Sequence, residues 1–476
     1  MSVISTFFDW KKTAPLGLTP QQQRKLWLRN FLKAFFVVFL AYASMYLVRN
    51  NFKAAQPSLK EDFGLTTLQL GYIGLAFSLV YAVGKVALGY VIDGRNTKKV
   101  ISVALIGASL VGILFGIVLS AHGSAIGVFV VLWALNGLFQ SVGGPGACNT
   151  VYRWVPRRHR ATSMGLWNTS HNLGGAFAGI IALWGANVFF GGNVAGMFIF
   201  PAVIGLIIGV IGYFYGKDDP HELGWDRCEV IFDEPIEQEN VAAETMSKWQ
   251  IFRRYTLSNP WIWILCIANV FAYILRIGVD NWAPLYVTEQ LHFSKEASVE
   301  TIFFFEMGAL IGTPLWGFVA GRLRGRNAAV GIAGLVGVFI SVFFYQTGTT
   351  AATVNGALFA LGLLVFAPLF LIPIAIVDMV PKRGLSVANG MAGLFGYMFG
   401  DSMAKVGLAA IADPKRDVLN IFGWVLHGWG SVFTVMYIAC IVCAVLLIPV
   451  AVREERKIRA ILKATREGAT TASVEA

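Results

Sequence analysis

Residues 31–49 read FLKAFFVVFLAYASMYLVR, a largely apolar run that is long enough to cross a membrane and that ends on an arginine. Its closing phrase, Tyr46-Leu47-Val48-Arg49, returns 227 residues later as Tyr273-Ile274-Leu275-Arg276, again within an apolar stretch. A guanidinium in or near a bilayer is costly and keeps its proton, so such arginines are rare and usually functional. Two of them in equivalent places of two similar stretches predict a pocket for an anion that both halves of the chain build.

The composition is that of a membrane protein. Of the 476 residues, 56% are hydrophobic and 14% are charged, and the mean hydropathy is +0.64, which is outside the range of soluble domains. The polar N-terminal segment has no cleavable signal pattern, so we expect the first span to remain in the mature protein. We predict an all-α membrane protein of twelve transmembrane helices, near 31–49, 68–92, 99–120, 125–148, 162–187, 195–215, 261–287, 300–320, 328–347, 353–378, 386–411 and 429–451.

This pattern divides the chain into two six-helix halves joined by a polar loop. The predicted organisation is a cytoplasmic segment 1–30, a first half 31–215, a central loop 216–260, a second half 261–452 and a cytoplasmic tail 453–476. Lysine and arginine gather in the even-numbered short loops, so the positive-inside rule places both termini in the cytoplasm. The net charge of +11 therefore predicts contact with anionic membrane lipid and not with nucleic acid.

Further landmarks repeat at nearly the same interval. The string from Gly89 to Arg95 corresponds to that from Gly317 to Arg322, and Val155-Pro-Arg-Arg158 corresponds to Val380-Pro-Lys-Arg383, at offsets of 228 and 225 residues. Two parallel six-helix halves are the architecture of the major facilitator superfamily. The string Gly-x-x-x-Asp-Gly-Arg-x-x-Lys-Lys at 89–99 resembles a signature of that superfamily, although the second copy has Gly321 in place of the acid.

Each arginine shares one helix face with aromatic and polar residues. These are Tyr42 and Tyr46 with Arg49 on the first span, and Asn269, Tyr273 and Asp280 with Arg276 on the seventh. Such stripes must face the bundle interior or a water-filled cavity. A guanidinium offers a planar fork of donors that binds phosphate oxygens better than an ammonium does. The alternative is that each arginine pairs with a carboxylate to hold helices together, and Asp280 keeps that alternative open for Arg276.

Other polar residues inside the predicted helices are weaker candidates. Lys85 either adds positive charge to the same site or neutralises Asp280, and His171, with Asn168 and Asn172 on its face, either is structural or donates a hydrogen bond to the anion. Asn136 and Gln140 are typical of hydrogen bonds between helices. Five further positions are assigned less definitely. Asp401 and Lys405 favour an intrahelical pair, with Tyr397 one turn earlier, whereas Glu306 and Asp378 are either proton sites or structural partners.

The chain shows none of the patterns typical of an enzyme. It has no catalytic acid pair, metal cluster or nucleotide-binding loop, so we expect neither catalysis nor a metal or cofactor. Its five cysteines lack metal-ligand spacing and are interpreted as packing residues. The run Gly143-Gly144-Pro145-Gly146 is interpreted as a place where the fourth span bends or packs closely.

Several longer motifs are similar to those of the organophosphate:phosphate antiporter family, and most of all to its hexose-phosphate transporters. The similarity covers roughly Arg24 to Arg459 and is carried by Arg49-Asn50-Asn51-Phe52, Trp167-Asn168-Thr169-Ser170-His171-Asn172-Leu173-Gly174-Gly175, Lys248-Trp249-Gln250-Ile251-Phe252, Gly400-Asp401-Ser402-x-Ala404-Lys405, the run 191–201 and the tail 454–459. The resemblance implies uptake of a phosphorylated sugar, such as glucose 6-phosphate, in exchange for inorganic phosphate across a bacterial inner membrane. It also implies that Arg49 and Arg276 bind the phosphate, with Lys85 and His171 nearby. We expect the transporter to be a monomer.

One departure from that family bears on the substrate. Its hexose-phosphate members carry an acid and a lysine three residues apart early in the eleventh span, where this chain has Asn389 and Ala392. We therefore predict that Asn389, Ala392 and the nearby Tyr397 influence which phosphate ester is accepted. Carriers for glycerol phosphate or phosphoglycerate, and a membrane receptor that reports a sugar phosphate without moving it, remain alternatives.

Overall fold

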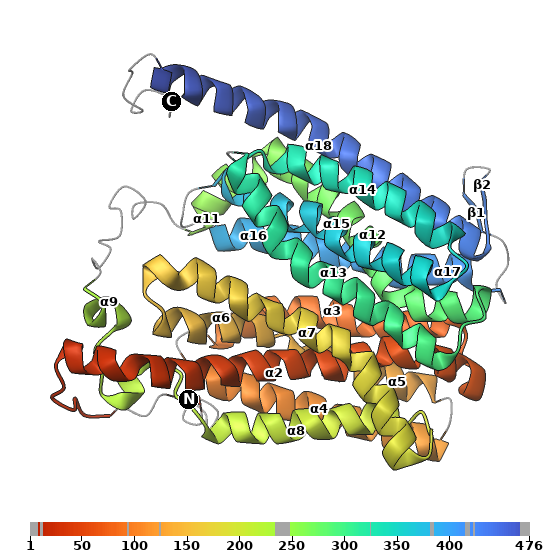
Figure 1. The fold of residues 1–476 in the computed structure, drawn as a ribbon, viewed down its shortest axis with the longest axis horizontal. Helices are drawn as coiled ribbons and strands as arrows, with labels where there is room; N and C mark the ends of the chain where they lie inside the picture. The colour runs from red at the N-terminus through yellow and green to blue at the C-terminus, as the bar shows by residue number, and fades with distance from the viewer. Residues whose placement is uncertain are drawn as a thin grey trace. The chain divides into compact units, whose positions relative to one another are not determined.

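The computed structural model describes residues 8–9, 13–92, 95–122, 125–233, 248–323, 325–380, 385–414, 419–421 and 424–466. The chain divides into two compact units (Figure 1). The first consists of Met1–Glu239 together with Trp282–Glu306, and the second consists of Asn240–Asn281 together with Met307–Ala476. The first unit therefore includes a short segment, Trp282–Glu306, that by sequence belongs to the second half.

The first unit is a bundle of long helices that pack along their lengths. The helix α2 packs against α7 and α8, while α4 packs against α8 and α3 packs against α5. Its elements are α2 (Pro20–Phe63), α3 (Thr67–Ile92), α4 (Thr97–His122), α5 (Ile126–Gln140), α6 (Gly143–Trp154), α7 (Arg157–Phe190), α8 (Gly196–Phe214), the 3-10 turn η1 (Pro220–Leu223) and α9 (Cys228–Ile231). A core around Trp154 and Trp167 joins α2, α4, α6 and α7.

Helix α2 is longer at both ends than the predicted span 31–49. It begins at a capping box, in which the Thr19 hydroxyl accepts a hydrogen bond from the Gln22 amide and the Gln22 side chain accepts one from the Thr19 amide. It ends at Gly64, whose φ of 67° lies in the left-handed region that glycine adopts without strain. Polar residues just outside the apolar run made both ends look like loops in the sequence.

The predicted fourth span consists of two helices, α5 and α6, separated by Ser141 and Val142. Close packing explains the glycine at the start of α6. A Cβ at Gly143 would lie 2.5 Å from the Met45 sulfur and 3.2 Å from the Tyr42 ring of α2. Of the two interpretations given for residues 143–146, close packing is therefore confirmed.

The second unit contains most of the remaining long helices. Helix α14 packs against α15 and α18. The elements after the central loop are α11 (Lys248–Ile251), the π-helical η2 (Phe252–Leu257), α12 (Pro260–Gln290), α13 (Lys295–Arg322), α14 (Asn327–Thr347), α15 (Ala351–Val377), α16 (Leu385–Phe395), the π-helical η4 (Gly396–Asp401) and η5 (Met403–Gly407), α17 (Leu408–Ala412), β1 (Leu419–Ile421), β2 (Trp424–Leu426) and α18 (Gly428–Arg466). The antiparallel pair β1 and β2, with Leu419 opposite Leu426, was not predicted.

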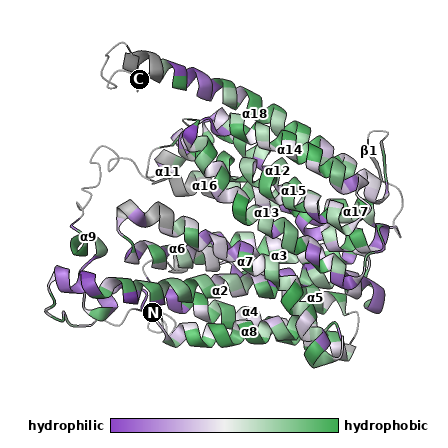
Figure 2. Cartoon of the chain, in the orientation of Figure 1, coloured by the Kyte–Doolittle hydropathy of each residue, from purple (hydrophilic) through white to green (hydrophobic). Residues whose placement is uncertain are grey.

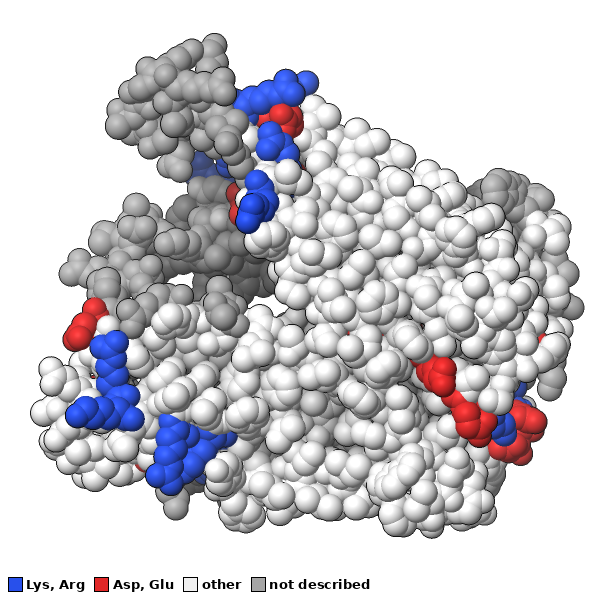
Figure 3. Space-filling view, in the orientation of Figure 1, with Lys and Arg blue, Asp and Glu red and all other residues white. Residues whose placement is uncertain are grey.

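Apart from this short strand pair, the predicted all-α membrane architecture is confirmed. Within the described residues, 11 helices are long and apolar enough to cross a membrane. The remaining predicted span, 386–411, is a helical path from α16 to α17 that the two π-helical segments interrupt. Hydrophobic residues line the middle of the long helices, hydrophilic residues gather toward their ends (Figure 2), and the lysines, arginines and acids of the visible face lie at those ends (Figure 3).

Candidate functional site

Arg49 lies on α2 with its guanidinium among three aromatic rings. Its Cζ atom is 4.6 Å from the ring centroid of Phe77 and 5.4 Å from those of Tyr46 and Tyr81. Phe77 and Tyr81 are one turn apart on α3, whereas Tyr46 precedes Arg49 on α2. The π faces of these rings attract the cation. The half-buried guanidinium is therefore held on the side of α2 that faces α3.

Amide side chains fix the backbone of α2 on either side of Arg49. The Asn136 side-chain amide of α5 donates to the carbonyl of Val48 at 3.2 Å, and Gln140 donates to the Asn136 oxygen at 2.7 Å. The Asn51 side chain donates to the carbonyl of Met197 on α8 at 3.1 Å. The hydrogen bonds between helices predicted for Asn136 are confirmed. The hydrogen bonds of Asn136 and Asn51 position Arg49 because they fix the helical turn of α2 that carries it.

His171 of α7 lies beside the same tyrosines. Its ring centroid is 5.4 Å from that of Tyr46 and 6.4 Å from that of Tyr42, and the residue is 8% exposed. Tyr42 in turn contacts Trp167 at 4.9 Å. Asn168, three residues before His171, is half-buried on α7. The structure thus brings Tyr42, Tyr46, Arg49 and His171 together along α2 and α7.

Lys85 is exposed on α3, one turn after Tyr81. Residues four apart on a helix share a face, so Lys85 is one turn further along the face whose tyrosine contacts Arg49. Its predicted contribution of positive charge to the site stays a prediction. Asp93, in the adjacent signature string, lies outside the described residues.

Arg276 has a similar setting in the second unit. Its guanidinium carbon is 4.8 Å from the ring centroid of Phe366 on α15, and the residue is half-buried. Asp280, one turn later on α12, is 3% exposed. The Tyr273 ring packs on Tyr397 of η4, with centroids 5.2 Å apart and the planes at 67°. Each predicted arginine therefore lies against an aromatic face and one turn from a tyrosine.

The eleventh span is docked closely onto the Arg276 face of α12. A Cβ at Gly396 would lie 2.7 Å from the Tyr273 ring, and one at Gly400 would lie 2.6 Å from the Tyr273 Cβ. The Asn269 side chain donates to the carbonyl of Ala392 at 2.9 Å. π-helical turns are rare and often occur at functional sites. Here the first of the two, η4, lies where the chain approaches Tyr273.

The specificity candidates in this span have different surroundings. The Ala392 side chain is 1% exposed, and its carbonyl accepts the hydrogen bond from Asn269. Tyr397 contacts Tyr273. The Asn389 side chain lies outside the described part of the chain. The influence of these residues on substrate choice stays a prediction.

The less definite acidic positions have polar contacts. The Lys405 ammonium donates to Asp401 at 3.1 Å, with both side chains buried, so the predicted intrahelical pair is confirmed. Glu306 of α13 is 1% exposed and accepts a hydrogen bond from the Asn50 amide at 3.4 Å. Asp378, at the end of α15, accepts one from Asn327 at 3.3 Å.

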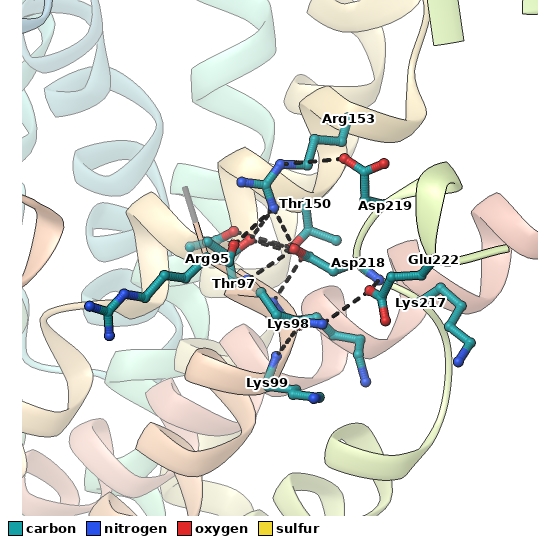
Figure 4. Close-up of polar contacts among 12 residues, drawn as sticks. Arg95, Thr97, Lys98, Lys99, Thr150, Arg153, Lys217, Asp218, Asp219 and Glu222 are labelled. Atoms are coloured by element: carbon teal, nitrogen blue, oxygen red, sulfur yellow. Dashed lines mark hydrogen bonds and ion pairs between the residues drawn. The ribbon is translucent and has the colours of Figure 1, made fainter. Parts of the chain in front are cut away.

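A polar cluster that sequence reasoning missed surrounds Asp218, just after α8 (Figure 4). This fully buried carboxylate caps the start of α4, where it accepts hydrogen bonds from the Thr97 and Lys98 amides, both at 3.0 Å. It also accepts from the Thr150 hydroxyl at 2.6 Å and pairs with Arg153, both on α6. An acid beside a helix start satisfies its free amides and interacts favourably with the helix dipole. Asp218 therefore joins α4, α6 and the segment after α8.

Lys98 and Glu222 complete this cluster. The Lys98 ammonium donates to the carbonyls of Gly212 and Tyr213 at 2.9 Å, and so caps the end of α8. The Glu222 carboxylate accepts from the Asn96 side chain at 3.0 Å and from the Asp218 amide at 2.9 Å. Burial raises the pKa of Glu222. The signal for this cluster is faint, because one aspartate after an apolar span resembles any loop acid.

The amino-acid sequence of this chain is similar to those of known membrane transporters. The model of the Major Facilitator Superfamily matches residues 38–404. The chain is 42% identical over 455 residues to the "Hexose-6-phosphate:phosphate antiporter" of Salmonella typhimurium, covering 95% of this chain and 97% of the relative. It is 30% identical over 420 residues to the "Glycerol-3-phosphate transporter" of Bacillus subtilis, covering 87% and 91%.

A solved structure shares the fold. A bacterial homolog of the human lysosomal transporter Spinster, described as inward-facing and unoccupied, superposes with a TM-score of 0.62 at 14% identity, covering 88% of this chain and 94% of the other. The matched family model and the relatives both extend over most of this multi-pass membrane protein. The chain therefore belongs to the Major Facilitator Superfamily and, within it, to the organophosphate:phosphate antiporters.

Proposed function

We propose that this protein takes up a hexose 6-phosphate, such as glucose 6-phosphate, in exchange for inorganic phosphate across the inner membrane of a bacterium. The observation that carries the proposal is the 42% identity to a hexose-6-phosphate:phosphate antiporter, which extends over 95% of this chain. The identity to the glycerol-3-phosphate transporter is 30%, so the hexose phosphate is preferred to the glycerol phosphate. A carrier has no chemical step, and the roles of its residues are to bind, to orient and to allow movement.

We further propose that Arg49 and Arg276 bind the phosphate group. Their half-buried guanidiniums keep their charge at any accessible pH and present the fork that matches two phosphate oxygens. The aromatic rings beside each one support this role because they orient the fork and lower the local dielectric, which strengthens attraction to an anion. Tyr42, Tyr46, His171 and Tyr273 are the proposed neighbours of the substrate.

The charges of the two arginines also explain why exchange would be favoured over one-way movement. A change of conformation that removes water from a guanidinium is costly when no anion offsets its charge. A bound phosphate dianion lowers that cost and permits the two halves to rock in alternating access. Inorganic phosphate and a phosphate ester can both bind to the two guanidiniums. Either anion therefore allows the carrier to change conformation, and inward movement of one is coupled to outward movement of the other.

Transport by purified protein in phosphate-loaded proteoliposomes tests this function. We expect exchange of labelled phosphate, inhibited by glucose 6-phosphate more strongly than by glycerol 3-phosphate or 3-phosphoglycerate. Failure of glucose 6-phosphate to compete would overturn the preferred substrate. Absence of any exchange, with binding of the sugar phosphate retained, would favour a receptor.

Replacing either arginine by lysine tests the phosphate-binding role. Arg49→Lys and Arg276→Lys keep the charge but lose the bidentate fork. We expect each variant to reach the membrane and to lose phosphate exchange by roughly 10- to 100-fold, since a hydrogen bond to a charged group contributes about 1.5–3 kcal/mol. Wild-type exchange by both variants would contradict the proposal.

A further inference from the structure

Polar side chains continue from Arg49 along one face of α2 toward its end at Phe63. Arg49, Lys53, Gln56 and Lys60 follow at i, i+4, i+7 and i+11, which is the spacing of a single helix face. The loop charges predict that this end of α2 lies outside the cytoplasm. Two lysines and a glutamine thus extend from the outer end of α2 to the arginine proposed to bind phosphate.

This part of α2 is buried although it is polar. All residues from Asn50 to Leu59 are buried, with Lys53 9% exposed and Gln56 0% exposed. Burying a charged side chain inside a membrane protein costs free energy, and this part of α2 is buried on all faces, including the one that carries Lys53. Its burial therefore requires an explanation.

The segment Trp282–Glu306, which by sequence belongs to the second half, contributes to this burial. The Lys60 ammonium pairs with Glu289 of α12. Lys295, at the start of α13, pairs with Glu61 at 3.0 Å and Asp62 at 3.4 Å. These ion pairs attach the outer ends of α12 and α13 to the outer end of α2. A carrier that alternates its access must break such contacts to open on this side.

The contacts continue from the ion pairs toward Arg49. A Cβ at Gly179 of α7 would lie 3.1 Å from Val299 and 3.3 Å from Ala54, so the three residues are packed closely. Phe177 of α7 meets Phe303 at 5.6 Å. The segment Trp282–Glu306 is therefore held against α2 and α7 by apolar packing as well as by ion pairs.

Gln56 is the observation that distinguishes a substrate route from structural packing. Both its amide nitrogen and its amide oxygen are buried, and neither has a hydrogen-bond partner among the described residues. A buried amide without partners destabilises the state that buries it. A residue that served only this packed state would be apolar or satisfied. The polar side chain is therefore explained by a second state in which it meets water or a ligand.

We propose that Lys53, Gln56 and Lys60 form an outer subsite for the phosphate group of a phosphate monoester, or for inorganic phosphate, on its way to Arg49. The subsite is exposed when Trp282–Glu306 moves away from α2. In the closed state the Glu289 carboxylate occupies the place beside Lys60 that the phosphate takes in the open one, while the Lys60 ammonium also donates to the Thr67 hydroxyl at 2.8 Å. This inference rests on the proposed phosphate exchange.

Lysine and glutamine variants in oriented proteoliposomes test the subsite. Lys53→Met removes the charge and is compatible with a buried position, so folding is expected to be retained. We expect the external KM for inorganic phosphate and for glucose 6-phosphate to rise about fivefold, because the variant loses the attraction of one nearby lysine for the anion. The maximal rate should be unchanged. Lys53→Arg should restore the wild-type value. The increase should shrink at high ionic strength, because salt screens the attraction, whereas a structural defect would persist.

Gln56→Leu provides a second, independent variant. It removes the unsatisfied amide and should stabilise the closed segment, so exchange should slow and the unfolding temperature should rise. Lys25→Met, an exposed charge near the other end of α2, is the matched control and should change neither KM nor rate.

The outcomes separate the two proposals. Unchanged external KM in Lys53→Met together with an unchanged rate in Gln56→Leu, while the wild type exchanges, would overturn the subsite alone. A KM increase equal on both faces of the membrane would also overturn it, since it would place Lys53 at the central site. Absence of exchange in the wild type would overturn the proposed function itself.

Discussion

Replacing Asp218 by asparagine should destabilise the first unit more than any neighbouring change. The Asp218 carboxylate accepts hydrogen bonds from the Thr97 and Lys98 amides at the start of α4 and from the Thr150 hydroxyl, and it pairs with Arg153. Asparagine retains one acceptor oxygen, turns an NH2 group toward the donors and leaves Arg153 with the more distant Asp219 carboxylate, at 3.9 Å. Removing one partner of a buried ion pair costs about 3–5 kcal/mol.

The lower end of that range applies because the Arg153 side chain is 18% exposed and recovers some hydration. A loss of about 3 kcal/mol corresponds to a fall of roughly 6–12 °C in the unfolding temperature for a unit of this size. Tryptophan fluorescence during heating of the purified protein measures it, because Trp154 and Trp225 lie in the core that the cluster supports.

Asp219→Asn is the matched control for this prediction. Its carboxylate lies 3.9 Å from the Arg153 Nε and is 16% exposed. It also accepts a hydrogen bond from the His221 amide at the start of the short 3-10 turn and lies 2.8 Å from the His221 Nδ1. We expect a change of about 1 kcal/mol or less, as for a single cap. Two results would refute the conclusion that Asp218 holds this cluster together. One is an unfolding temperature of Asp218→Asn equal to that of the wild type, and the other is an equal fall in unfolding temperature in the two variants.

Three further changes follow from contacts in the two units. Burial raises the pKa of Glu222 above its ordinary 4.5, so the folded state retains a proton that the unfolded chain releases, and stability falls as pH rises through the window above 4.5. Glu222→Gln should therefore raise the unfolding temperature near neutral pH but not in acid, and a pH-independent difference would contradict this. A Cβ at Gly400 would lie 2.6 Å from the Tyr273 Cβ, so Gly400→Ala should cost about 1–3 kcal/mol and slow exchange. Gly393→Ala, with no atom within 4 Å, serves as the control that should neither lower stability nor slow exchange, because alanine is the better helix former there. The Glu454 carboxylate accepts from the first turn of α14 at 2.8 Å, so Glu454→Ala should lower the unfolding temperature by the loss of about 1 kcal/mol, and an unchanged temperature would exclude this cap.

The helices and the two arginines could be predicted because their signals are local. Apolar length identifies a membrane span, and a guanidinium inside such a span is conspicuous whatever surrounds it. The repeated Tyr-x-x-Arg then indicates equivalent positions in the two halves. Helical periodicity also places Tyr42, Tyr46 and Arg49 on one face, and the structure brings them together with His171.

The missed features depend on partners that are distant in sequence. The ends of α2 lie in polar sequence, where hydropathy gives no signal and only the cap geometry at Thr19 and Gly64 defines the helix. The π-helical turn at 396–401 lies against Tyr273, which belongs to another helix, so its cause is not contained in the local sequence. Asp218 is 121 residues from the Thr97 amide that it caps, so no window of sequence contains the pair.

The two halves use the same kind of contact in different sequence positions. In each, the third helix begins beside a carboxylate supplied from the end of the sixth: Asp218 caps α4, and Glu454 accepts from the Ala328 amide of α14. The first carboxylate follows the end of α8, whereas the second lies within α18, which continues to Arg466. Sequence spacing therefore conceals the equivalence.

This repeated contact bears on how a half can move. A helix start that is covered by protein cannot use water to satisfy its amides, so the carboxylate that replaces water must remain in place. The third and sixth helices of each half should accordingly stay joined at this end throughout a transport cycle. Movement must then occur at contacts that are partly hydrated and whose partners can be exchanged. The pair of Lys60 with Glu289 fits that description, since both side chains are about one-fifth exposed and the proposed outer subsite has phosphate replace the carboxylate.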